Sequence, residues 1–565
     1  MENQQPSVAV IGLGSQGLVA LKNLLEEGFA TSGFEKHSYV GGIWHYSTNV
    51  QVSALQSTVV NVSRERACFT DFAFPEETSS YPSAREVDQY LNAYCNHFDL
   101  HKHICLSTEV KSVDRNEANN KWLLSIATNG QLPETLEFDK IVLATGPHVV
   151  PKQPVLEGRS LFSGSVIHSI SFKDPASFDG KRVMVVGMSN SAADTATSMV
   201  GIAKEIFLSH RHGSVVLPRY LKDGTSLDHN LSWRQSGIKD ILDGFAPRLG
   251  ARFIDSITGR ISRENFGDFD PEWNLNTPPS LLHQAPTVSD TLIPALRNGS
   301  IISTAAPSHI TGPNTIQLED GNTLHVDAII YCTGYEVDYS VLGRFDPTLI
   351  DPTASEVRNK VTPRLYQNVF SLTYPESLAF VGIAIAFSPA FMISDLTSMA
   401  IAQLWSTHPH APVLPPQKTI DQWYEDHLVW ADYLRSLSPH RKFVPLMVQN
   451  GPWLKWVEGA AGTRLEENLS CTSFQAWRYW WNDRKFCALL TDGIWSPHMY
   501  RLFESDRRKK WNGARAAIEA VNTNVQERIE RMKLQNDEQY ENRTRHTCSS
   551  WSPVTVCQIS ISHAT

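Results

Sequence analysis

Near its start the chain carries the glycine-rich turn that decides its fold, Gly12-Leu13-Gly14-Ser15-Gln16-Gly17. The turn follows the continuous apolar run of residues 8–11, which is typical of a parallel strand buried on both faces. It precedes a stretch from Leu18 to Glu27 that we predict to be a helix. Gly12 can take the tight turn, Gly14 lets backbone N–H groups approach a pyrophosphate, and Gly17 lets the helix pack closely on the strand. The stretch therefore predicts a dinucleotide-binding βαβ unit.

An acidic residue stands where such a unit needs one. Glu35 directly follows the next apolar segment, residues 30–34, and lies twenty-three residues past Gly12. A carboxylate at this place can accept hydrogen bonds from both hydroxyls of a ribose. A lone glycine triplet would also fit an ordinary turn, whereas strand, glycines, helix and acid in register predict a nucleotide site.

A second fingerprint lies about 175 residues further along the chain, Gly187-Met188-Ser189-Asn190-Ser191-Ala192. It follows another apolar run, residues 182–186, and precedes a helical stretch from Ala193 to Val200. Ser189 stands where the middle glycine usually lies, so its Cβ has to fit beside the phosphates, although its hydroxyl can donate to one. Because each fingerprint needs its own βαβ unit, the chain is predicted to bind two nucleotides.

The strand predicted after the second fingerprint, residues 205–211, ends in Arg211 rather than in an acid. A carboxylate there would repel a 2′-phosphate, whereas a guanidinium can hold one in a bidentate pair. We therefore interpret the second site as one that binds NADPH in preference to NADH. The alternative is that Arg211 is a solvated surface charge.

Further motifs lie between and around the two fingerprints. They are the F-x-G-x-x-x-H-x-x-x-[YF] pattern at residues 162–172, the turn Gly41-Gly42-Ile43-Trp44, the stretches 60–65 and 69–72, and the strand ends 143–146 and 331–335. From about residue 7 to about 405 the chain thereby resembles the flavin-containing monooxygenase family, the dimethylaniline-type class B flavoprotein monooxygenases. The resemblance implies an α/β fold with two Rossmann-like domains. It also implies that FAD lies at the first fingerprint and NADPH at the second, and that the NADP domain is inserted into the FAD domain.

The resemblance also assigns site residues. Asn61 matches the family residue whose amide contacts the bound nicotinamide nucleotide and the oxygenated flavin, which makes Asn61 the expected catalytic residue; the alternative is a turn residue that bonds local backbone. Trp44 could instead be simple core packing, and His168 is interpreted as a structural or linker residue. The residues expected to bind the two cofactors are Gly12, Leu13, Gly14, Ser15, Gly17, Glu35, Gly42, Ile43, Trp44, Val60, Asn61, Gly187, Ser189, Asn190, Ser191, Ala192 and Arg211.

The activity that the resemblance implies is NADPH-dependent monooxygenation. Reduced FAD would trap O₂ as a C4a-(hydro)peroxide and pass one oxygen atom to a soft heteroatom or an activated carbon of a small molecule. One alternative is a Baeyer-Villiger-type oxygenase of a ketone, against which Phe172 argues mildly, because those relatives usually carry tryptophan there. Another is a non-oxygenating NADPH oxidase or redox-sensing flavoprotein. No short motif encodes the substrate, and a role in secondary metabolism is a hypothesis only.

Composition agrees with a cytoplasmic enzyme. A net charge of −9, with 41% hydrophobic and 19% charged residues, gives no reason to expect a nucleic acid or an anionic membrane surface as partner. The eight cysteines are scattered without C-x-x-C or metal-ligand spacing, so we expect reduced thiols and no metal site. The longest apolar run, residues 378–387, is too short to cross a bilayer. No signal peptide is evident, and no membrane anchor is expected.

The predicted organisation places the first half of the FAD domain at 1–154 and the NADPH domain at 155–335, with an irregular, cap-like insertion at about 217–305. Residues 336–480 complete the FAD domain, and 481–565 form a helical extension whose last twenty residues are disordered. The aromatic segment 476–481 is interpreted as domain packing rather than a substrate box. A helix is expected over 505–533, with an apolar face that packs on the body or forms a homodimer; its members are Ile518, Val521, Val525, Ile529 and Met532.

Overall fold

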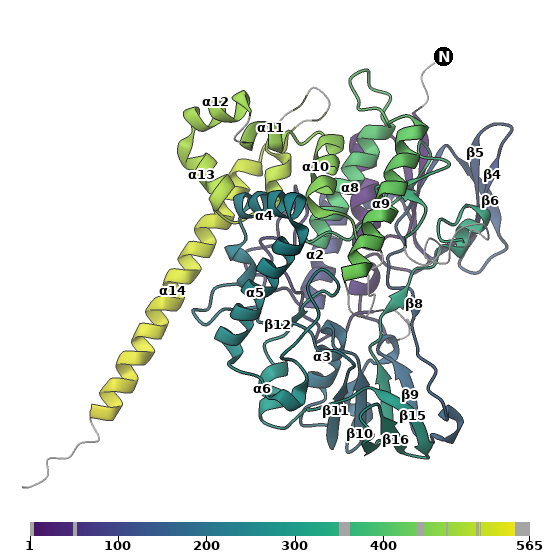
Figure 1. The fold of residues 1–565 in the computed structure, drawn as a ribbon. Helices are drawn as coiled ribbons and strands as arrows, with labels where there is room; N and C mark the ends of the chain where they lie inside the picture. The colour runs from purple at the N-terminus through teal and green to yellow at the C-terminus, as the bar shows by residue number, and fades with distance from the viewer. Residues whose placement is uncertain are drawn as a thin grey trace, which may run out of the picture.

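The fold is built on two larger sheets with helices packed around them (Figure 1); the seven-stranded sheet is mainly parallel with an antiparallel edge, and the five-stranded sheet is wholly parallel. This computed structural model describes residues 5–48, 53–349, 362–437, 446–470, 473–503, 505, 508 and 510–548. The larger sheet, which defines the first domain, has the spatial order β20 (Leu365–Tyr366), β21 (Phe370–Ser371), β22 (Leu378–Phe380), β7 (Lys140–Leu143), β1 (Ser7–Ile11), β2 (Ala30–Phe34) and β3 (Ile104–Cys105). The other, which defines the second domain, has the order β14 (Ile302–Thr304), β11 (Glu205–Ser209), β10 (Arg182–Val186), β18 (Ala328–Tyr331) and β9 (Ser165–His168).

The strand order shows that one domain is inserted into the other. In the first domain β1 pairs in parallel with β2 and β7, and β7 pairs in parallel with β22. All strands of the second sheet come from the chain between β7 and β22, and all their pairings are parallel. The apolar runs predicted as strands β1 and β10 are buried, as parallel strands covered on both faces require. The predicted α/β fold with two Rossmann-like units is confirmed.

Smaller elements complete the two domains. Short strands form two three-stranded sheets and two pairs, which are β4 (Thr108–Asn116), β5 (Lys121–Thr128) and β6 (Glu134–Phe138); β15 (Pro307–Gly312), β16 (Thr315–Leu318) and β17 (Thr323–His325); β8 (Val150–Pro151) with β19 (Tyr335–Glu336); and β12 (Val216–Leu217) with β13 (Thr287–Val288). The helices are α1 (Ser15–Glu26), α2 (Ala84–His97), α3 (Asn190–Ser198), α4 (Trp233–Phe245), α5 (Pro247–Phe266), α6 (Leu292–Arg297), α8 (Ala390–Trp405), α9 (Gln417–Leu437), α10 (Asn450–Ala461), α11 (Leu465–Leu469), α12 (Phe474–Asn482), α13 (Arg484–Asp492) and α14 (Ala514–Cys548). None of the described helices combines the length and apolar composition that a bilayer crossing requires.

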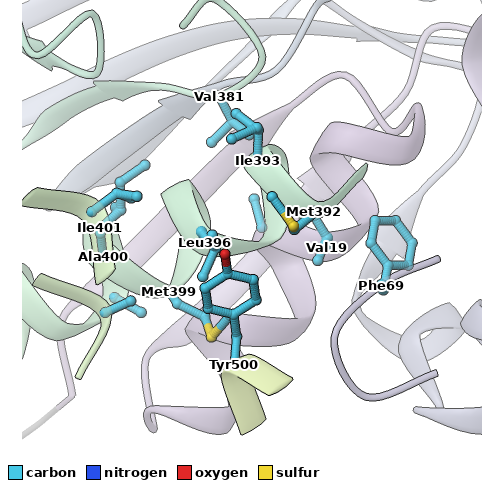
Figure 2. Packing of buried hydrophobic residues seen from close by; sticks show 14 of the residues in the cluster. Val19, Phe69, Val381, Met392, Ile393, Leu396, Met399, Ala400, Ile401 and Tyr500 are labelled. Atoms are coloured by element: carbon cyan, nitrogen blue, oxygen red, sulfur yellow. The ribbon is translucent and has the colours of Figure 1, made fainter. Parts of the chain in front are cut away.

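The core of the first domain joins segments from both ends of the chain. Helix α8 is buried along nearly its whole length and packs beside α1. Figure 2 shows Leu396 and Met399 of α8 close to Tyr500, which belongs to the 3₁₀ helix η9 (Pro497–Arg501). Tyr500 is 1% exposed. The C-terminal extension is therefore part of this core, and apolar burial of this kind stabilises by about 25 cal/mol per Å².

The insertion at about 217–305 is helical and not irregular, so that prediction is wrong. Helix α4 begins at a capping box formed by Ser232 and Gln235, and α5 has Pro247 in its first turn. Glycines lie within these helices at 237, 244 and 259, and a Cβ at each would meet nothing within 4 Å, so the helices carry them on open faces. The end of the insertion is β14, an edge strand of the second sheet. The role of the segment as a cap stays a prediction.

The aromatic segment 476–481 packs on the body only in part. The interpretation above holds for Tyr479, which packs against the core of the first domain, and is wrong for the exposed tryptophans. Helix α12 buries only Ala476, whereas Trp481 is 70% exposed and Trp477 58%. Arg484 lies over the rings of Trp480 and Trp481, at 4.5 and 4.7 Å from their centroids. Aromatic richness predicted burial, but the short helix can turn only one face toward the protein, and that face carries Ala476 and Tyr479 rather than the tryptophans.

Helix α14 begins at Ala514, later than predicted, and runs beyond residue 533 (Figure 1). Its first turns pack on the body, because Ile518 is fully buried and Val525 is 2% exposed. This agrees with packing on the body for that part of the predicted apolar face. A homodimer through α14 stays a prediction. Residues 549–565, most of the tail predicted to be disordered, lie outside the described residues.

Candidate functional site

The first fingerprint needs glycine at two positions for reasons of space. Gly12 directly follows β1 with φ of +89°, and a Cβ on it would lie 2.8 Å from the Ala144 carbonyl oxygen. A Cβ on Gly17 would lie 1.8 Å from the carbonyl oxygen of Gly12. The predicted roles of these two glycines, a tight turn and close packing of helix on strand, are thereby accounted for.

Gly14 is different, because the space beside it is open. A Cβ on Gly14 would meet nothing closer than the Cα of Gly42, at 3.6 Å. Gly14 is the N-cap of α1, and its lack of a side chain leaves the first-turn N–H groups, which begin at Ser15, uncapped by it. Uncapped N–H groups and the helix dipole attract an anion. This cradle fits the pyrophosphate of a dinucleotide such as FAD.

Glu35 shapes the same loop. Its carboxylate accepts a hydrogen bond from the backbone N–H of Leu13 at 2.8 Å and another from that of His37 at 3.0 Å. Glu35 directly follows β2 and is 6% exposed. Each carboxylate oxygen can accept a second hydrogen bond, so these contacts leave room for the predicted ribose interaction.

The turn at residues 41–44 lies directly against the first fingerprint. Gly41 forms a bridge with Gly14, and Gly42 has φ of +58° with its would-be Cβ 3.0 Å from the Gly14 Cα. Ile43 is 37% exposed. Trp44 packs edge to face on Phe391 at 6.5 Å between ring centroids, so its ring does contribute to the core. The structure therefore brings this turn to the first nucleotide site, and the contact of Ile43 and Trp44 with a cofactor stays a prediction.

The second fingerprint has the same geometry. Gly187 follows β10 with φ of +140°, and a Cβ on it would lie 2.5 Å from the carbonyl oxygen of Cys332. Ser189 is the N-cap of α3 and makes no side-chain hydrogen bond to the first turn. Ser189 and Ser191 are exposed, whereas Ala192 is buried against the sheet. The Asn190 side-chain oxygen accepts from the N–H of Val288 at 2.7 Å. These residues fit the phosphates of a second nucleotide.

Arg211 lies beyond the strand that was expected to end at it, because β11 ends at Ser209. Ser209, two residues before Arg211, is nevertheless next to the second fingerprint in space, since the N–H of Gly187 donates to the carbonyl oxygen of Ser209 at 2.9 Å. Arg211 is exposed, as both the predicted phosphate contact and the solvated-charge alternative require. The sequence analysis did not single out Asp194, which lies in α3. Burial raises the pKa of the Asp194 carboxyl to about 6, although the charge of Arg219 opposes the shift.

His168 has the structural role predicted for it. Its Nδ1 accepts from the N–H of Ile170 at 3.3 Å, and its Nε2 is 3.1 Å from the carbonyl oxygen of Gly334. His168 ends β9 and Gly334 lies between β18 and β19, so this residue ties two segments of the second domain together. Both ring nitrogens are engaged by backbone, which leaves no free nitrogen for chemistry.

Asn61 lies in a segment of the first domain that the insertion holds. The Nη2 atom of Arg219 donates to the Asn61 side-chain oxygen at 3.2 Å and to the carbonyl oxygen of Val59 at 3.0 Å. Its Nε donates to the carbonyl oxygen of Val60 at 3.1 Å. Arg219 follows β12, 158 residues along the chain from Asn61. The Asn61 side chain therefore bonds the other domain, unlike a turn residue that bonds local backbone.

The residues that follow Asn61 also make contacts with the insertion and with α14. Asp228 accepts the backbone N–H of Ser63 at 2.8 Å, and the Asp228 carbonyl oxygen accepts from Arg66 at 3.0 Å. Glu65 lies 3.2 Å from the Nε2 of His229 and 2.9 Å from the Nη2 of Arg528 in α14. Ser63, Glu65 and Arg66 are each at most 5% exposed. The insertion and α14 thus cover residues 63–66. No local pattern in the sequence predicts these contacts.

The charge of Glu65 is stabilised by its neighbours. Burial alone would raise the pKa of Glu65, but His229, Arg528 and Arg64 lower it to about 2 through hydrogen bonds and charge. A lowered pKa stabilises the folded protein above the ordinary value of 4.5, and the contribution is lost as the pH falls toward 2. At about 1.4 kcal/mol for each pKa unit, ionised Glu65 contributes up to about 3 kcal/mol at neutral pH.

Known proteins place the chain in a family. The model of flavin-binding monooxygenase-like proteins matches residues 5–425. The chain belongs to this family. It is therefore an FAD-dependent, NADPH-using monooxygenase, as predicted. That the two cradles described above bind its two nucleotides stays a prediction.

Individual relatives agree with the assignment. Monooxygenase aurF of Gibberella zeae is 41% identical over 530 residues, which are 93% of this chain and 99% of that protein. Flavin-containing monooxygenase 2 of Homo sapiens is 29% identical over 410 residues, 70% of this chain and 73% of that protein. Among solved structures, S-allyl-L-cysteine S-oxygenase of Allium sativum has the same fold, with a TM-score of 0.60, 20% identity and coverage of 93% of this chain and 99% of that one.

The open space beside Gly14 makes a prediction about FAD. Gly14→Val should fold, because the backbone of Gly14 is extended and no protein atom crowds the new side chain, but the side chain should fill the cradle. The purified variant should lack the visible absorbance of bound flavin. Gly17→Val is the contrast: it should fail to accumulate as folded protein, because its Cβ would collide with backbone. A yellow Gly14→Val protein would contradict this assignment of the cradle.

The lowered pKa of Glu65 makes a prediction about stability. Glu65→Gln should lower the free energy of unfolding at pH 7 by up to about 3 kcal/mol. The loss should be clearly smaller at pH 3, which lies between the folded pKa of about 2 and the ordinary 4.5, because the carboxyl of the unfolded wild-type chain is then already protonated. Urea denaturation at the two pH values measures the difference. Glu77→Gln, the same change at an exposed glutamate nearby, is the control and should have little effect. An equal loss at both pH values would show that the charge of Glu65 does not matter.

Proposed function

We propose that the protein inserts one atom of O₂ into a small organic molecule at a site built around Asn61. The observation that carries the proposal is the position of Asn61, where a first-domain segment meets the insertion of the second domain. A flavin held at Gly14 and a nicotinamide held at Ser189 have to meet between the two domains. An amide at that boundary can reach both, as the resemblance of the surrounding motif implies.

In this proposal different residues of the chain bind the two cofactors, position them and exclude water. When bound, FAD takes hydride from NADPH and activates O₂ for transfer to the substrate. Gly14 and Ser189 mark the helix starts that bind the two pyrophosphates, Glu35 holds the ribose of FAD, and Arg211 holds the 2′-phosphate of NADPH. Asn61 donates hydrogen bonds that position nucleotide and flavin. The buried segment 63–66 excludes water beneath the insertion, which protects the activated oxygen from loss as H₂O₂.

The experiment that tests the function is a substrate panel. Purified protein would be incubated with NADPH, ¹⁸O-labelled O₂ and a set of amines, sulfides, ketones and phenols, and products analysed by mass spectrometry. Incorporation of one labelled atom into a panel member supports the proposal, and the product identifies the class. A ketone converted to an ester would establish the Baeyer-Villiger alternative. Full conversion of NADPH and O₂ to H₂O₂ with every candidate would favour the oxidase alternative.

We also propose a cytoplasmic location. The five described cysteines are free thiols, and four of them, Cys68, Cys95, Cys332 and Cys487, are buried. Reduced thiols are typical of the cytoplasm. The likeness to Monooxygenase aurF of Gibberella zeae along 93% of the chain is compatible with the hypothesis of a role in secondary metabolism.

Arg211 provides a test of nucleotide selectivity. Arg211→Ala should raise the KM for NADPH while leaving the use of NADH nearly unchanged, because only NADPH carries the 2′-phosphate. The loss in kcat/KM for NADPH should correspond to about 1.5–3 kcal/mol, the value of one charged hydrogen-bonding contact. Steady-state kinetics with both nucleotides measures it, with NADH as internal control. Equal effects on the two nucleotides would make Arg211 a solvated surface charge.

Asn61 provides a test of the catalytic assignment. Asn61→Ala should bind FAD normally, because the loss of one partly buried polar side chain costs only about 1 kcal/mol. Reduction by NADPH should persist, but electrons should appear as H₂O₂ instead of oxygenated product. The ratio of product to NADPH consumed, together with H₂O₂ release, measures this coupling. A variant that couples as well as the wild type would make Asn61 a structural residue.

A further inference from the structure

Arg219 contacts three consecutive residues around the proposed catalytic amide. Its guanidinium donates to the carbonyl oxygens of Val59 and Val60 and to the side-chain oxygen of Asn61, at 3.0, 3.1 and 3.2 Å. The side chain of Arg219 is 10% exposed. One side chain of the second domain therefore hydrogen-bonds both the backbone of residues 59–60 and the side-chain amide of Asn61 in the first domain.

The chemistry of these contacts determines how Asn61 is turned. A guanidinium carries only donors, so the amide has to present its oxygen to Arg219. The NH₂ group of Asn61 then points away from the guanidinium and remains a donor for other acceptors. Such an orientation suits an amide that donates to a nucleotide or a flavin. Without Arg219 the amide could turn over and present its oxygen instead.

Arg219 is itself held from the second domain. Its backbone N–H donates to one oxygen of Asp290 at 2.8 Å, and its Nη1 lies 3.4 Å from the other. Asp290 lies between β13 and α6. Two residues earlier in the chain, the backbone N–H of Val288 donates to the side chain of Asn190 in the second fingerprint. A continuous set of contacts thus connects the predicted NADPH site with Asn61.

We propose that Arg219 is a positioning residue that holds the Asn61 amide with its NH₂ group toward the cofactors, so that efficient transfer of oxygen to substrate depends on Arg219. The inference rests on the proposed function of Asn61. A lysine cannot replace the arginine, because a single ammonium group cannot reach three acceptors in the fixed geometry of the guanidinium fork.

The primary variant is Arg219→Lys, which keeps the charge and removes the fork. The holoenzyme should contain FAD, and its KM for NADPH and its rate of flavin reduction should change by less than about twofold. The product formed for each NADPH should fall by about tenfold, as expected for one charge-assisted hydrogen bond. A merely structural arginine would not give this split between binding and coupling. Normal coupling in Arg219→Lys would overturn the proposal.

The matched control is Arg182→Lys. Arg182 is also an ion-paired arginine of the second domain, with Asp327 at 3.0 Å, but it lies at the first residue of β10, at the opposite end of that strand from the fingerprint. Coupling should be unchanged in this variant. If it fell as in Arg219→Lys, the effect would be a general one of weakening the domain, and the proposal would be overturned.

A double-mutant cycle shows whether Arg219 acts through Asn61. In an Asn61→Ala background, Arg219→Lys should cause no further loss of coupling, because the group that Arg219 positions is gone. A further loss of about tenfold would mean that Arg219 acts independently and would overturn the proposal. If Asn61→Ala alone couples normally, the proposed role of Asn61 fails and this inference with it. If only Arg219→Lys couples normally, the role of Asn61 stands and this inference alone fails.

A second variant tests the proposal if Arg219→Lys does not accumulate as FAD-loaded protein. Asp290→Asn retains Arg219 and every contact with residues 59–61 but weakens the hold on the guanidinium. Coupling should fall severalfold, less than in Arg219→Lys, with FAD content unchanged. Wild-type coupling in Asp290→Asn together with a misfolded Arg219→Lys would overturn the proposal, because Arg219 would then act only in folding.

Discussion

The parallel pairing of β7 with β22 is the constraint on which the rest of the molecule depends. Leu378 to Phe380 lie beside Ile141 to Leu143, although the whole second domain intervenes in the chain. The two segments of chain that connect the domains also pair with each other, since β8 at the start of the second domain and β19 at its end are antiparallel neighbours. Two adjacent crossings limit how the second domain can rotate. The insertion that the second domain carries is thereby brought over residues 59–66, where the contacts of Arg219, Asp228 and His229 are made.

Sequence reasoning succeeded where the backbone itself imposes the residue. Gly12, Gly17 and Gly187 were singled out by their spacing, and in each case a Cβ would collide with a backbone atom. These requirements follow from the βαβ arrangement itself. A Cβ on Gly17 would meet the Gly12 carbonyl oxygen, whereas a Cβ on Gly12 or Gly187 would meet Ala144 or Cys332, at the end of the neighbouring strand of each sheet. The strands and helices around both fingerprints could be predicted for the same reason, with errors of a few residues at their ends. The strand after the second fingerprint, for example, ends at Ser209 and not at Arg211.

Sequence reasoning failed where tertiary contacts decide. Nothing near Arg219 in the sequence indicates that its guanidinium reaches Asn61, 158 residues away, because long-range polar contacts have no periodicity. The insertion at about 217–305 was predicted to be irregular, but propensity is a weak guide there, because the exposed faces of α4 and α5 tolerate glycine. The tryptophans of α12 predicted burial, but composition does not tell which face of a helix turns inward. Each error concerns the environment of a segment rather than its local chemistry.

The extension beyond the family match belongs to the first domain for an electrostatic reason as well as an apolar one. The family model ends at residue 425, yet Arg501 forms ion pairs with Glu26 of α1 at 2.6 Å and with Asp71 at 3.0 Å. Lys22 pairs with the same Asp71, whose side chain is 4% exposed. Although burial opposes it, the surrounding cations hold the pKa of Glu26 well below its usual range. Buried charges are tolerated only when paired, so removing Arg501 would take away a cation that Glu26 and Asp71 share and leave Lys22 to face both carboxylates beside the helix that begins at the first fingerprint. The extension thus helps to hold α1, the helix that begins at the predicted FAD cradle, and the match to the 41% identical relative covers 93% of this chain, most of the extension included.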